Sequence, residues 1–427
     1  MGQKELRQTE TGKIPNDWEV LSLGNEKACQ IIMGQSPPSS TYNKIQEGLP
    51  FLQGNMEFGE IYPSPTIYCS EPIKMAGKND ILISVRAPVG DVNISPSKVC
   101  IGRGLSAIRC NPKRISHLFL FYYLKYIGKT FESISAGSTF KAIRKNDLDQ
   151  LDIFLPPLPE QQKIAEILST VDQGIEKVDE AIKKTRRLKN GLMQELLTKG
   201  IDHKEFKDTE VGRIPKGWDI MKLGEIANVR YGLGQPPAIE ANGIPMIRAT
   251  NVKRGRIVRE GLIFINPGAV PNSRDPFLSV GDILVVRSGA YTGDVALVTK
   301  EWEGAIAGYD LIVTPSGTID SQFLTYYLLS SPVQKRHFVG LKVRSAQPHL
   351  NSSQVEETPI PLPPLQEQQR IAEILSTVDE RLESLRNRKE KLGRIKKGLM
   401  NDLLTGKVRV TKLIEREVQD SSSLRLE

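Results

Sequence analysis

The stretch LPPLPEQQKIAEILSTVD, residues 155–172, returns as LPPLQEQQRIAEILSTVD at residues 362–379. The match continues without a gap to residues 200 and 407, at an offset of 207 residues, with 26 identities in 46 positions. A second pair of stretches, TETGKIPNDWEVLSLG at 9–24 and TEVGRIPKGWDIMKLG at 209–224, shares eight identities in sixteen positions. The chain is therefore a tandem duplication, and each copy is long enough for a domain plus a helix.

Between these matching ends the two copies agree much less. ILISVRAPVGDV at 81–92 answers ILVVRSGAYTGDV at 283–295, and Tyr122-Tyr123-Leu124 answers Tyr326-Tyr327-Leu328. Short β-rich runs at 81–85 and 283–286, bounded by Gly, Pro and Asn, are typical of strands and turns. The sequence thus predicts two tandem α+β domains of one fold whose loops differ, which indicates two surfaces with the same task on different targets.

Each domain ends in a proline-rich exit that is followed by a long helical pattern. Large apolar residues recur in steps of three and four, which indicates a continuous seam along an α-helix of about 40 residues and about 60 Å. The seam positions are Ile164, Leu168, Val171, Ile175, Val178, Ile182, Thr185, Leu188, Leu192 and Leu196, then Ile371, Leu375, Val378, Leu382, Leu385, Lys389, Leu392, Ile395, Leu399 and Leu403. Leaving such seams in water would cost ~1.5–3 kcal/mol per large side chain.

Connectivity predicts how the two helices run. The first helix carries the chain from the first domain to the second, whereas the second helix starts at the second domain. They can bury their seams on one another only if they are antiparallel, with a pseudo-two-fold axis across their middle. The predicted domains are residues 1–154 and 201–361, the helical segments are 155–200 and 362–407, and a tail covers 408–427.

The overall composition is that of a basic globular protein. Its 58 Lys+Arg against 50 Asp+Glu give a formal net charge of +8, which favours a polyanionic partner. The surplus is scattered, so folding would have to assemble any nucleic-acid surface. The sequence has neither a long apolar run nor a signal peptide, and its four cysteines form no CxxC pair, so we expect a cytoplasmic, membrane-free protein with unpaired thiols.

The sequence lacks the main catalytic motifs. It has no complete Walker loop, HExxH, GxSxG or Asn/Asp-Pro-Pro-aromatic signature of base methylation. Gly102-x-Gly104-x-x-Ala107 resembles a dinucleotide turn without the following helix, and Glu205-x-Lys207 has nuclease spacing in what is better explained as a solvated linker. We expect a binding protein with no catalytic residue, metal site or cofactor of its own. A chain with its own hydrolytic or methylating site, and a coiled-coil scaffold without DNA binding, are the alternatives.

Three groups of residues are candidates for DNA contact. They are the acid-free loop RATNVKRGRIVR at 248–259, the stretch before each proline-rich exit, and one arginine after each β-rich run. The alternatives are a solvated basic loop, and salt bridges from these two arginines to Asp91 or Asp294. The stretch 52–61 matches the loop but carries Gln53 and Asn55, so the two copies would read different targets. The candidates are Arg86, Lys141, Arg144, Lys145, Arg248, Lys253, Arg254, Arg256, Arg287, Lys342, Arg344 and Gln347.

The repeated motifs resemble those of the specificity subunits of type I restriction-modification enzymes. The motifs are TE(T/V)G(K/R)IPxxW, LPPLxEQxxIAxIL and GLMxxLLT, each present twice and in the same order. The resemblance implies two target recognition domains, each reading half of a bipartite site in double-stranded DNA. It also implies helices that dock two methyltransferase subunits holding S-adenosylmethionine, with nuclease-translocase subunits joining for cleavage. ATP and Mg²⁺ are expected in those partner subunits.

The helix pair would then act as a ruler between half-sites about 34–36 Å apart. Partners related by the pseudo-two-fold axis should meet repeated residues, so we expect Gly191, Leu192, Gly398 and Leu399 to contact them. The two glycines would mark a close helix approach, since each costs up to about 1 kcal/mol relative to Ala. A locally loose helix end is the alternative.

Overall fold

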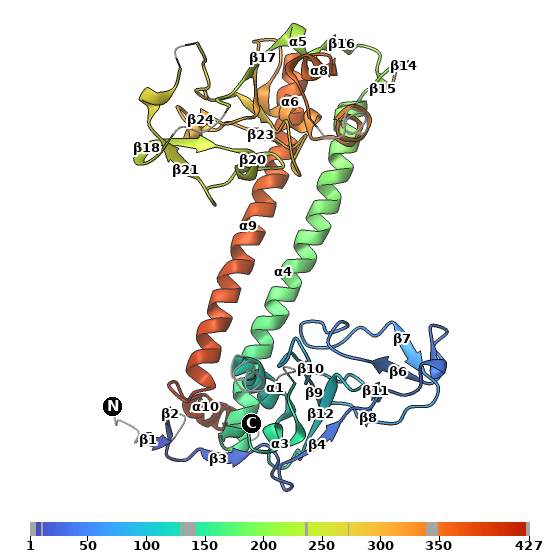
Figure 1. The fold of residues 1–427 in the computed structure, drawn as a ribbon, viewed down its shortest axis with the longest axis vertical. Coiled ribbons are helices and arrows are strands. Elements are labelled where there is room, and N and C mark those ends of the chain that lie inside the picture. The colour runs from blue at the N-terminus through green and yellow to red at the C-terminus, as the bar shows by residue number, and fades with distance from the viewer. Residues whose placement is uncertain are drawn as a thin grey trace. The chain divides into compact units, whose positions relative to one another are not determined.

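The computed structural model describes residues 6–9, 12–128, 131, 142–234, 238–271, 273–338 and 349–423. The chain forms two compact units, unit 1 with residues 1–179 and 387–427 and unit 2 with residues 180–386. Each of the two long helices, α4 (Leu158–Lys199) and α9 (Leu365–Leu403), contributes one part to each unit (Figure 1). A unit therefore contains one α+β domain and a segment of both helices.

Unit 1 is built on two main sheets. An antiparallel sheet has the order β10-β9-β12-β4, and a mixed sheet has the order β5-β7-β6-β11-β8 with β6 and β11 parallel. Two-stranded ladders join β1 to β2 and β3 to β13. The strands are β1 Leu6–Thr9, β2 Gly12–Pro15, β3 Glu19–Ser22, β4 Cys29–Met33, β5 Tyr42–Asn43, β6 Leu49–Leu52, β7 Ile67–Cys69, β8 Met75–Ala76, β9 Ile81–Ser84, β10 Val92–Ile94, β11 Val99–Ile101, β12 Leu105–Cys110 and β13 Asp152–Leu155.

Unit 2 repeats this plan. Its antiparallel sheet β23-β22-β25-β17 matches the first sheet of unit 1 strand for strand, and β18 and β24 repeat the parallel pair. The duplicated fold and the predicted strands at 81 and 283 are therefore confirmed. The strands are β14 Phe206–Thr209, β15 Gly212–Pro215, β16 Asp219–Lys222, β17 Ala227–Tyr231, β18 Ile239–Ile247, β19 Val252–Lys253, β20 Arg256–Ile257, β21 Ile263–Ile265, β22 Ile283–Val285, β23 Val295–Leu297, β24 Ile306–Ala307, β25 Leu311–Pro315 and β26 Pro359–Leu362.

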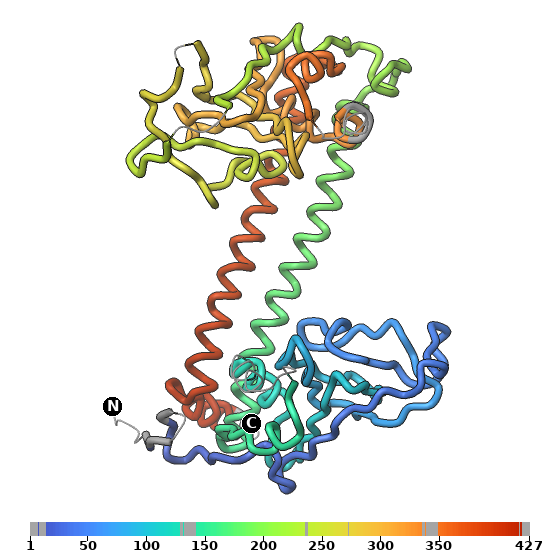
Figure 2. The backbone as a smooth tube through the Cα atoms, viewed as in Figure 1, coloured from blue at the N-terminus to red at the C-terminus, as the bar shows by residue number. Residues whose placement is uncertain are grey.

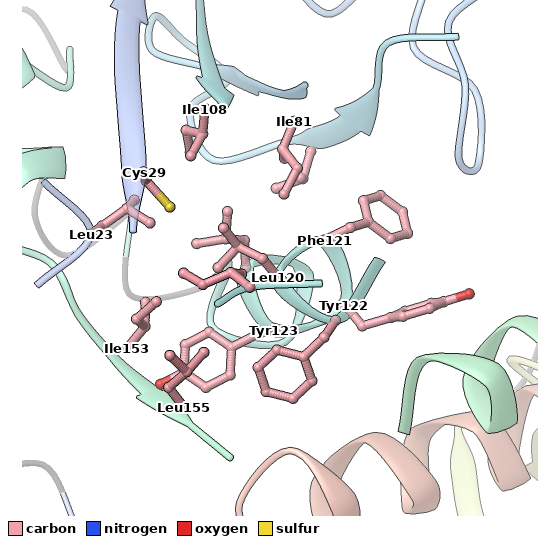
Figure 3. Packing of buried hydrophobic residues seen from close by; sticks show 14 of the residues in the cluster. Leu23, Cys29, Ile81, Ile108, Leu120, Phe121, Tyr122, Tyr123, Ile153 and Leu155 are labelled. Carbon is pink, nitrogen blue, oxygen red and sulfur yellow. The ribbon is translucent and has the colours of Figure 1, made fainter. Parts of the chain in front are cut away.

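A short apolar helix lies at the centre of each core. Ser116 caps α1 and Asp320 caps α6, each by accepting a bond from a phenylalanine amide. Helix α1 is apolar on nearly all sides, as expected of a buried helix, and packs against strand residues such as Ile81 and Ile153 (Figure 3). The helices are α1 His117–Tyr126, α3 Lys145–Asp149, α5 Leu223–Ile226, α6 Ser321–Leu328, α8 Ser352–Glu356 and α10 Thr411–Ser423, and the short turns are η1 Ser39–Thr41, η2 Ala249–Asn251, η3 Pro267–Ala269, η4 Lys300–Trp302 and η5 Val333–Phe338.

The long helices run antiparallel within each unit. In unit 1, Asp172 pairs with Lys396 (2.5 Å) and Asp179 with Lys389 (2.7 Å), so seven residues forward on α4 match seven backward on α9. Lys389, the polar break of the predicted seam, is thus paired. The seam prediction is wrong at the equivalent residues Leu188 and Ile395, which are 55% and 43% exposed.

Each long helix starts at one domain and ends in the core of the other. Leu196 and Leu197, from the end of α4, belong to the core of unit 2. Leu403 and Leu404, at the end of α9, belong to the core of unit 1, which the following segment joins through Val410. The C-terminal helix α10 belongs to unit 1, where its Glu417 pairs with Lys163 of α4 and its Ile414 packs against the core (Figure 2). This exchange explains why the GLMxxLLT motif is repeated.

Candidate nucleic-acid interface

A buried glutamine attaches each domain to its own long helix. The side-chain oxygen of Gln161 accepts a bond from the Ser116 amide (2.9 Å), and its nitrogen donates to the carbonyls of Arg114 (2.9 Å) and Pro156 (2.8 Å). Gln368 makes the same bonds to the start of α6 and to the proline-rich exit of unit 2. Because a buried amide costs free energy unless it is bonded, these three bonds fix the angle between helix and domain.

A tyrosine, an aspartate and a lysine join the domain of unit 1 to both helices. Tyr122, on α1, donates to Asp172 of α4 (2.8 Å), and Lys396 of α9 pairs with the same carboxylate. The Lys396 ammonium also lies 5.8 Å from the centre of the Tyr122 ring. Burial raises the pKa of Tyr122 above its usual range, so the phenol keeps the proton that it donates.

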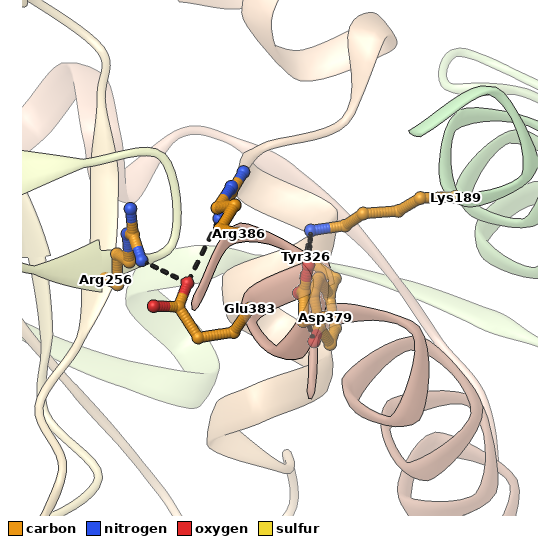
Figure 4. Close-up of polar contacts among 6 residues, drawn as sticks. All are labelled: Lys189, Arg256, Tyr326, Asp379, Glu383 and Arg386. Atoms are coloured by element: carbon orange, nitrogen blue, oxygen red, sulfur yellow. Dashed lines mark hydrogen bonds and ion pairs between the residues drawn. The ribbon is translucent and has the colours of Figure 1, made fainter. Parts of the chain in front are cut away.

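Unit 2 contains the same three-residue contact (Figure 4). Tyr326 donates to Asp379 (2.9 Å), to which Lys189 of α4 binds (2.6 Å). Unit 2 also has a second contact between domain and helix. Arg256, from the acid-free loop, pairs with Glu383 of α9 (2.6 Å). Unit 2 is therefore held to α9 through its acid-free loop as well.

A tryptophan and a glutamate form the third repeated attachment. Trp18 donates to Glu160 (3.3 Å), whose carboxylate also receives two bonds from Arg409 (2.7 and 2.6 Å). The equivalent Glu367 of unit 2 accepts from the equivalent tryptophan (3.1 Å) and contacts His203 in place of an arginine (2.8 Å). These attachments involve the residues that the two copies share, which leaves the divergent loops for recognition.

The most ordered candidate for DNA contact is Arg287. Its guanidinium carbon lies 4.7 Å from the ring centre of Tyr231 and 4.5 Å from that of Tyr309, whose side chains are 37% and 47% exposed. Its Nε donates to the carbonyl of Leu350 (3.2 Å), and a terminal nitrogen contacts His349 Nε2. We call Tyr231, Arg287, Tyr309 and His349 the arginine–tyrosine cluster. It holds a cation between two aromatic rings at the surface of unit 2.

A buried carboxylate supports this cluster from below. Asp310 is 2% exposed, and its carboxylate accepts a bond from the backbone amide of Arg287 (3.2 Å). Burial raises the pKa of Asp310 from 3.8 to about 6, while the Arg287 amide and charge oppose that rise. Asp310 is therefore mostly ionised at neutral pH.

The basic loop at 248–259 is largely tied down by its own unit. Arg254 and Gly255 have positive φ angles of 35° and 100° and form the two-residue turn between β19 and β20. Lys253 lies 3.9 Å from the ring centre of Tyr291, which is 40% exposed. The remaining basic residues bind Glu383, Glu301 and the carbonyl of Gly261, and they are Arg256, Arg259 and Arg248, in that order.

The predicted equivalence of Arg86 and Arg287 is wrong. The Val85 carbonyl accepts from the Ile143 amide (2.9 Å), and the Arg287 carbonyl makes the same bond in unit 2 (2.8 Å). Arg287 therefore occupies the backbone position of buried Val85, because the extra residue of unit 2 lies in the following turn rather than in the strand. Arg86 is exposed one position later, and Asp91 accepts from Asn55 (2.5 Å).

Unit 1 presents other polar side chains at its corresponding edge. Gln53 donates to the Ser36 hydroxyl (2.9 Å), which accepts from the Arg103 amide (3.1 Å), and the side chains of Gln53 and Arg103 are exposed. Arg144 is exposed at the start of α3, and Lys145 pairs with Asp149 within that helix (2.8 Å). Among the other predicted contacts, Lys141, Lys342, Arg344 and Gln347 lie outside the described residues.

The predicted partner-binding residues divide into two kinds. Gly191 and Gly398 are exposed, and a Cβ atom built on either would have no neighbour within 4 Å. The close approach expected of these glycines therefore does not occur between elements that the structure describes. Leu192 and Leu399 are half-buried and pack against the cores of units 2 and 1.

Comparison with known proteins identifies the family. The model of the type I restriction modification DNA specificity domain matches residues 15–184 and 215–394, one match per copy. The MjaVIII type I restriction enzyme specificity subunit of Methanocaldococcus jannaschii is 30% identical over 94% of this chain and 95% of its own length. The chain belongs to the family of type I restriction-modification specificity subunits. As a specificity subunit it recognises DNA and supplies no catalytic site of its own.

Further relatives agree in sequence and fold. A Methanocaldococcus jannaschii protein assigned as the MjaX specificity subunit is 53% identical over 195 residues, and this match spans about half of each chain, 46%. The solved S subunit from M. genitalium has the same fold, with a TM-score of 0.60 and 18% identity over 93% of this chain and 98% of that one. Among the described residues, no helix is both long enough and apolar enough to cross a membrane.

Sequence reasoning missed the aromatic part of the candidate DNA-contact surface of this specificity subunit. Tyr231 and Tyr309 are far apart in the sequence and meet because β17 pairs with β25, next to Arg287. His349, which no sequence motif singles out, contacts Arg287 as well. Exposed tyrosines beside glycines at strand ends, as in AGYDL at 307–311, were the available signal.

Proposed function

We propose that this specificity subunit reads a bipartite site in double-stranded DNA, with one half-site for each unit, and acts in the cytoplasm. The observation that carries the proposal is the division of labour within each unit. The attachments between domain and helices mostly use equivalent residues in the two units, whereas the exposed loops of the two domains carry different polar and aromatic side chains. Similar attachments combined with different exposed surfaces suit two domains that bind different half-sites.

The two surfaces offer distinct recognition chemistry. Unit 1 presents Gln53, Arg86 and Arg103 as exposed side chains, and unit 2 presents the arginine–tyrosine cluster with the neighbouring Lys253. Amide and guanidinium groups contact base edges or phosphates. We therefore expect two unrelated half-site sequences rather than a palindrome.

Equivalent exposed patches on the long helices support a pair of identical partner subunits. Leu188 and Ile395 are exposed at matching positions, and each lies three residues before an exposed glycine, Gly191 or Gly398. An exposed large apolar residue beside open space suits contact with another protein. The proposed partners are two methyltransferase subunits, which would hold S-adenosylmethionine and methylate the base. Nuclease-translocase subunits, with ATP and Mg²⁺, would join them for cleavage.

The proposal is tested by mapping methylated bases in DNA modified by the full chain together with its methyltransferase partners. We expect one motif made of two defined half-sites with an unspecified spacer. A single contiguous motif, or methylation without sequence preference, would refute the proposal. Methylation by the chain alone would instead favour a catalytic site of its own.

The role of the helices as a ruler is tested by a matched deletion. Removing residues 173–179 of α4 and 389–395 of α9 takes out the Asp179–Lys389 pair together and leaves Asp172–Lys396 in place. Seven residues shorten a helix by about 10 Å, which is about three base pairs of DNA. We expect a shorter spacer between unchanged half-sites. An unaltered spacer in the methylated motif would rule the ruler out.

A further inference from the structure

We infer that Arg287 reads a guanine in the half-site bound by unit 2, an inference that rests on the proposed function. The cluster fixes the orientation of the Arg287 guanidinium, and a phosphate contact does not require a fixed orientation. The guanidinium has one aromatic ring within 4.7 Å and a second within 4.5 Å of its central carbon. Two of its nitrogens are engaged by Leu350 and His349. The side chain is thus held in a single orientation before DNA arrives.

The remaining donors of Arg287 match one base. A guanidinium has five N–H groups. Nε uses one on the Leu350 carbonyl and Nη2 directs one to His349, and among the described residues the guanidinium makes no other hydrogen bond. One Nη1 proton and the second Nη2 proton can therefore point in parallel along the edge between the two terminal nitrogens. Burial and the Arg287 charge lower the pKa of His349, which keeps its ring neutral and able to accept. Two parallel donors fit the O6 and N7 acceptors of guanine, whereas adenine and cytosine present an amino donor in the major groove.

Preorganisation also favours a base over a phosphate. An arginine that is already ordered loses less conformational entropy for each hydrogen bond that it forms, and it can reject a base whose donors face its own. Exposed arginines such as Arg86 are better suited to phosphates, which need no defined orientation. Buried Val85 occupies the equivalent backbone position in unit 1. The guanine contact therefore belongs to unit 2 alone.

The test compares the methylated motifs produced by the full chain with its methyltransferase partners. Arg287→Ala and Arg287→Gln remove the guanidinium, and Gln keeps a donor for the Leu350 carbonyl. Lys222→Ala is the matched control, because Lys222 is a basic residue of the same domain that pairs with Glu357 and lies outside the candidate DNA contacts. We expect both Arg287 variants to lose about 5- to 150-fold in preference for G·C at one position of one half-site. The other half-site and the control should keep the wild-type motif.

The half-site of unit 1 serves as an internal control for folding and assembly. If both half-sites keep their sequence in Arg287→Gln, the guanine contact is refuted while the proposed function stands. A uniform loss of binding to all sequences, with a salt dependence lower by about one ion, would assign Arg287 to a phosphate and refute the contact as well. A wild-type complex without a bipartite motif would refute the proposed function itself. A thermal unfolding transition of unit 2 at the wild-type temperature confirms that each variant is folded.

Discussion

The two units use the same residues for attachment and different residues at their surfaces. Both contain the tyrosine–aspartate–lysine contact and the buried glutamine. At one equivalent backbone position, however, unit 1 has Val85, whose amide donates to the carbonyl of Gly104, and unit 2 has Arg287, whose amide donates to the carboxylate of Asp310. A duplicated fold can therefore keep its attachments to the helices while the residues at one strand end change.

The largest expected effect tests whether the repeated attachments are equally strong. Asp172 and Lys396 are 13% and 15% exposed, whereas Asp379 is 39% exposed. Asp172→Ala strands a lysine and a tyrosine hydroxyl away from water and should cost about 3 kcal/mol of unfolding free energy, against about 1 kcal/mol for Asp379→Ala. Urea unfolding measures both, with Asp179→Ala, from the half-buried pair with Lys389, as control. Equal losses would show that burial does not distinguish the two contacts.

An effect of similar size should separate the units by pH. Below about pH 4 Asp310 is protonated in both the folded and the unfolded chain. Between about pH 4 and 6 the unfolded chain ionises first, because burial raises the pKa of the folded Asp310 from 3.8 to about 6. Unit 2 should lose about 3 kcal/mol of stability over this range as the pH rises. In unit 1 the equivalent acceptor is the backbone carbonyl of Gly104, which does not titrate.

Asp310→Asn tests whether Asp310 causes this pH dependence of stability. The asparagine oxygen can still accept from the Arg287 amide, but it does not titrate. We expect the variant to be more stable than the wild type above pH 6 and to lack this dependence between pH 4 and 6 in thermal unfolding. A pH profile that is parallel to that of the wild type would show that Asp310 has an ordinary pKa in the folded chain.

The smallest expected effect concerns the basic loop of unit 2. Arg254→Ala together with Arg256→Ala should weaken DNA binding several-fold and lower its salt dependence by about one ion. The expected change is one rather than two, because Arg256 is already paired with Glu383. Titration of DNA at several salt concentrations measures it. An unchanged salt slope would show that the β19–β20 turn faces away from DNA.

Several errors of the sequence analysis have a common physical cause. The steps of three and four identified both long helices, but Leu188 and Ile395 are exposed although Leu196 and Leu403, on the same seams, are buried in the domain cores. Periodicity reports which residues share a helix face and not what packs against it. The arginines at 86 and 287 were paired by residue type, whereas the backbone bonds placed the insertion one turn later.

The sequence by itself determined the duplication, the two long antiparallel helices, the paired α+β domains and the family, because repeats and helical periods are local patterns that survive without coordinates. Only the tertiary structure decided which polar residues anchor the domains and which gather at an exposed surface. Tyr231, Arg287, Tyr309 and His349 come from distant segments, and strand pairing with burial brings them together. Non-local contacts of this kind depend on the packed fold, and a linear sequence does not specify them one residue at a time.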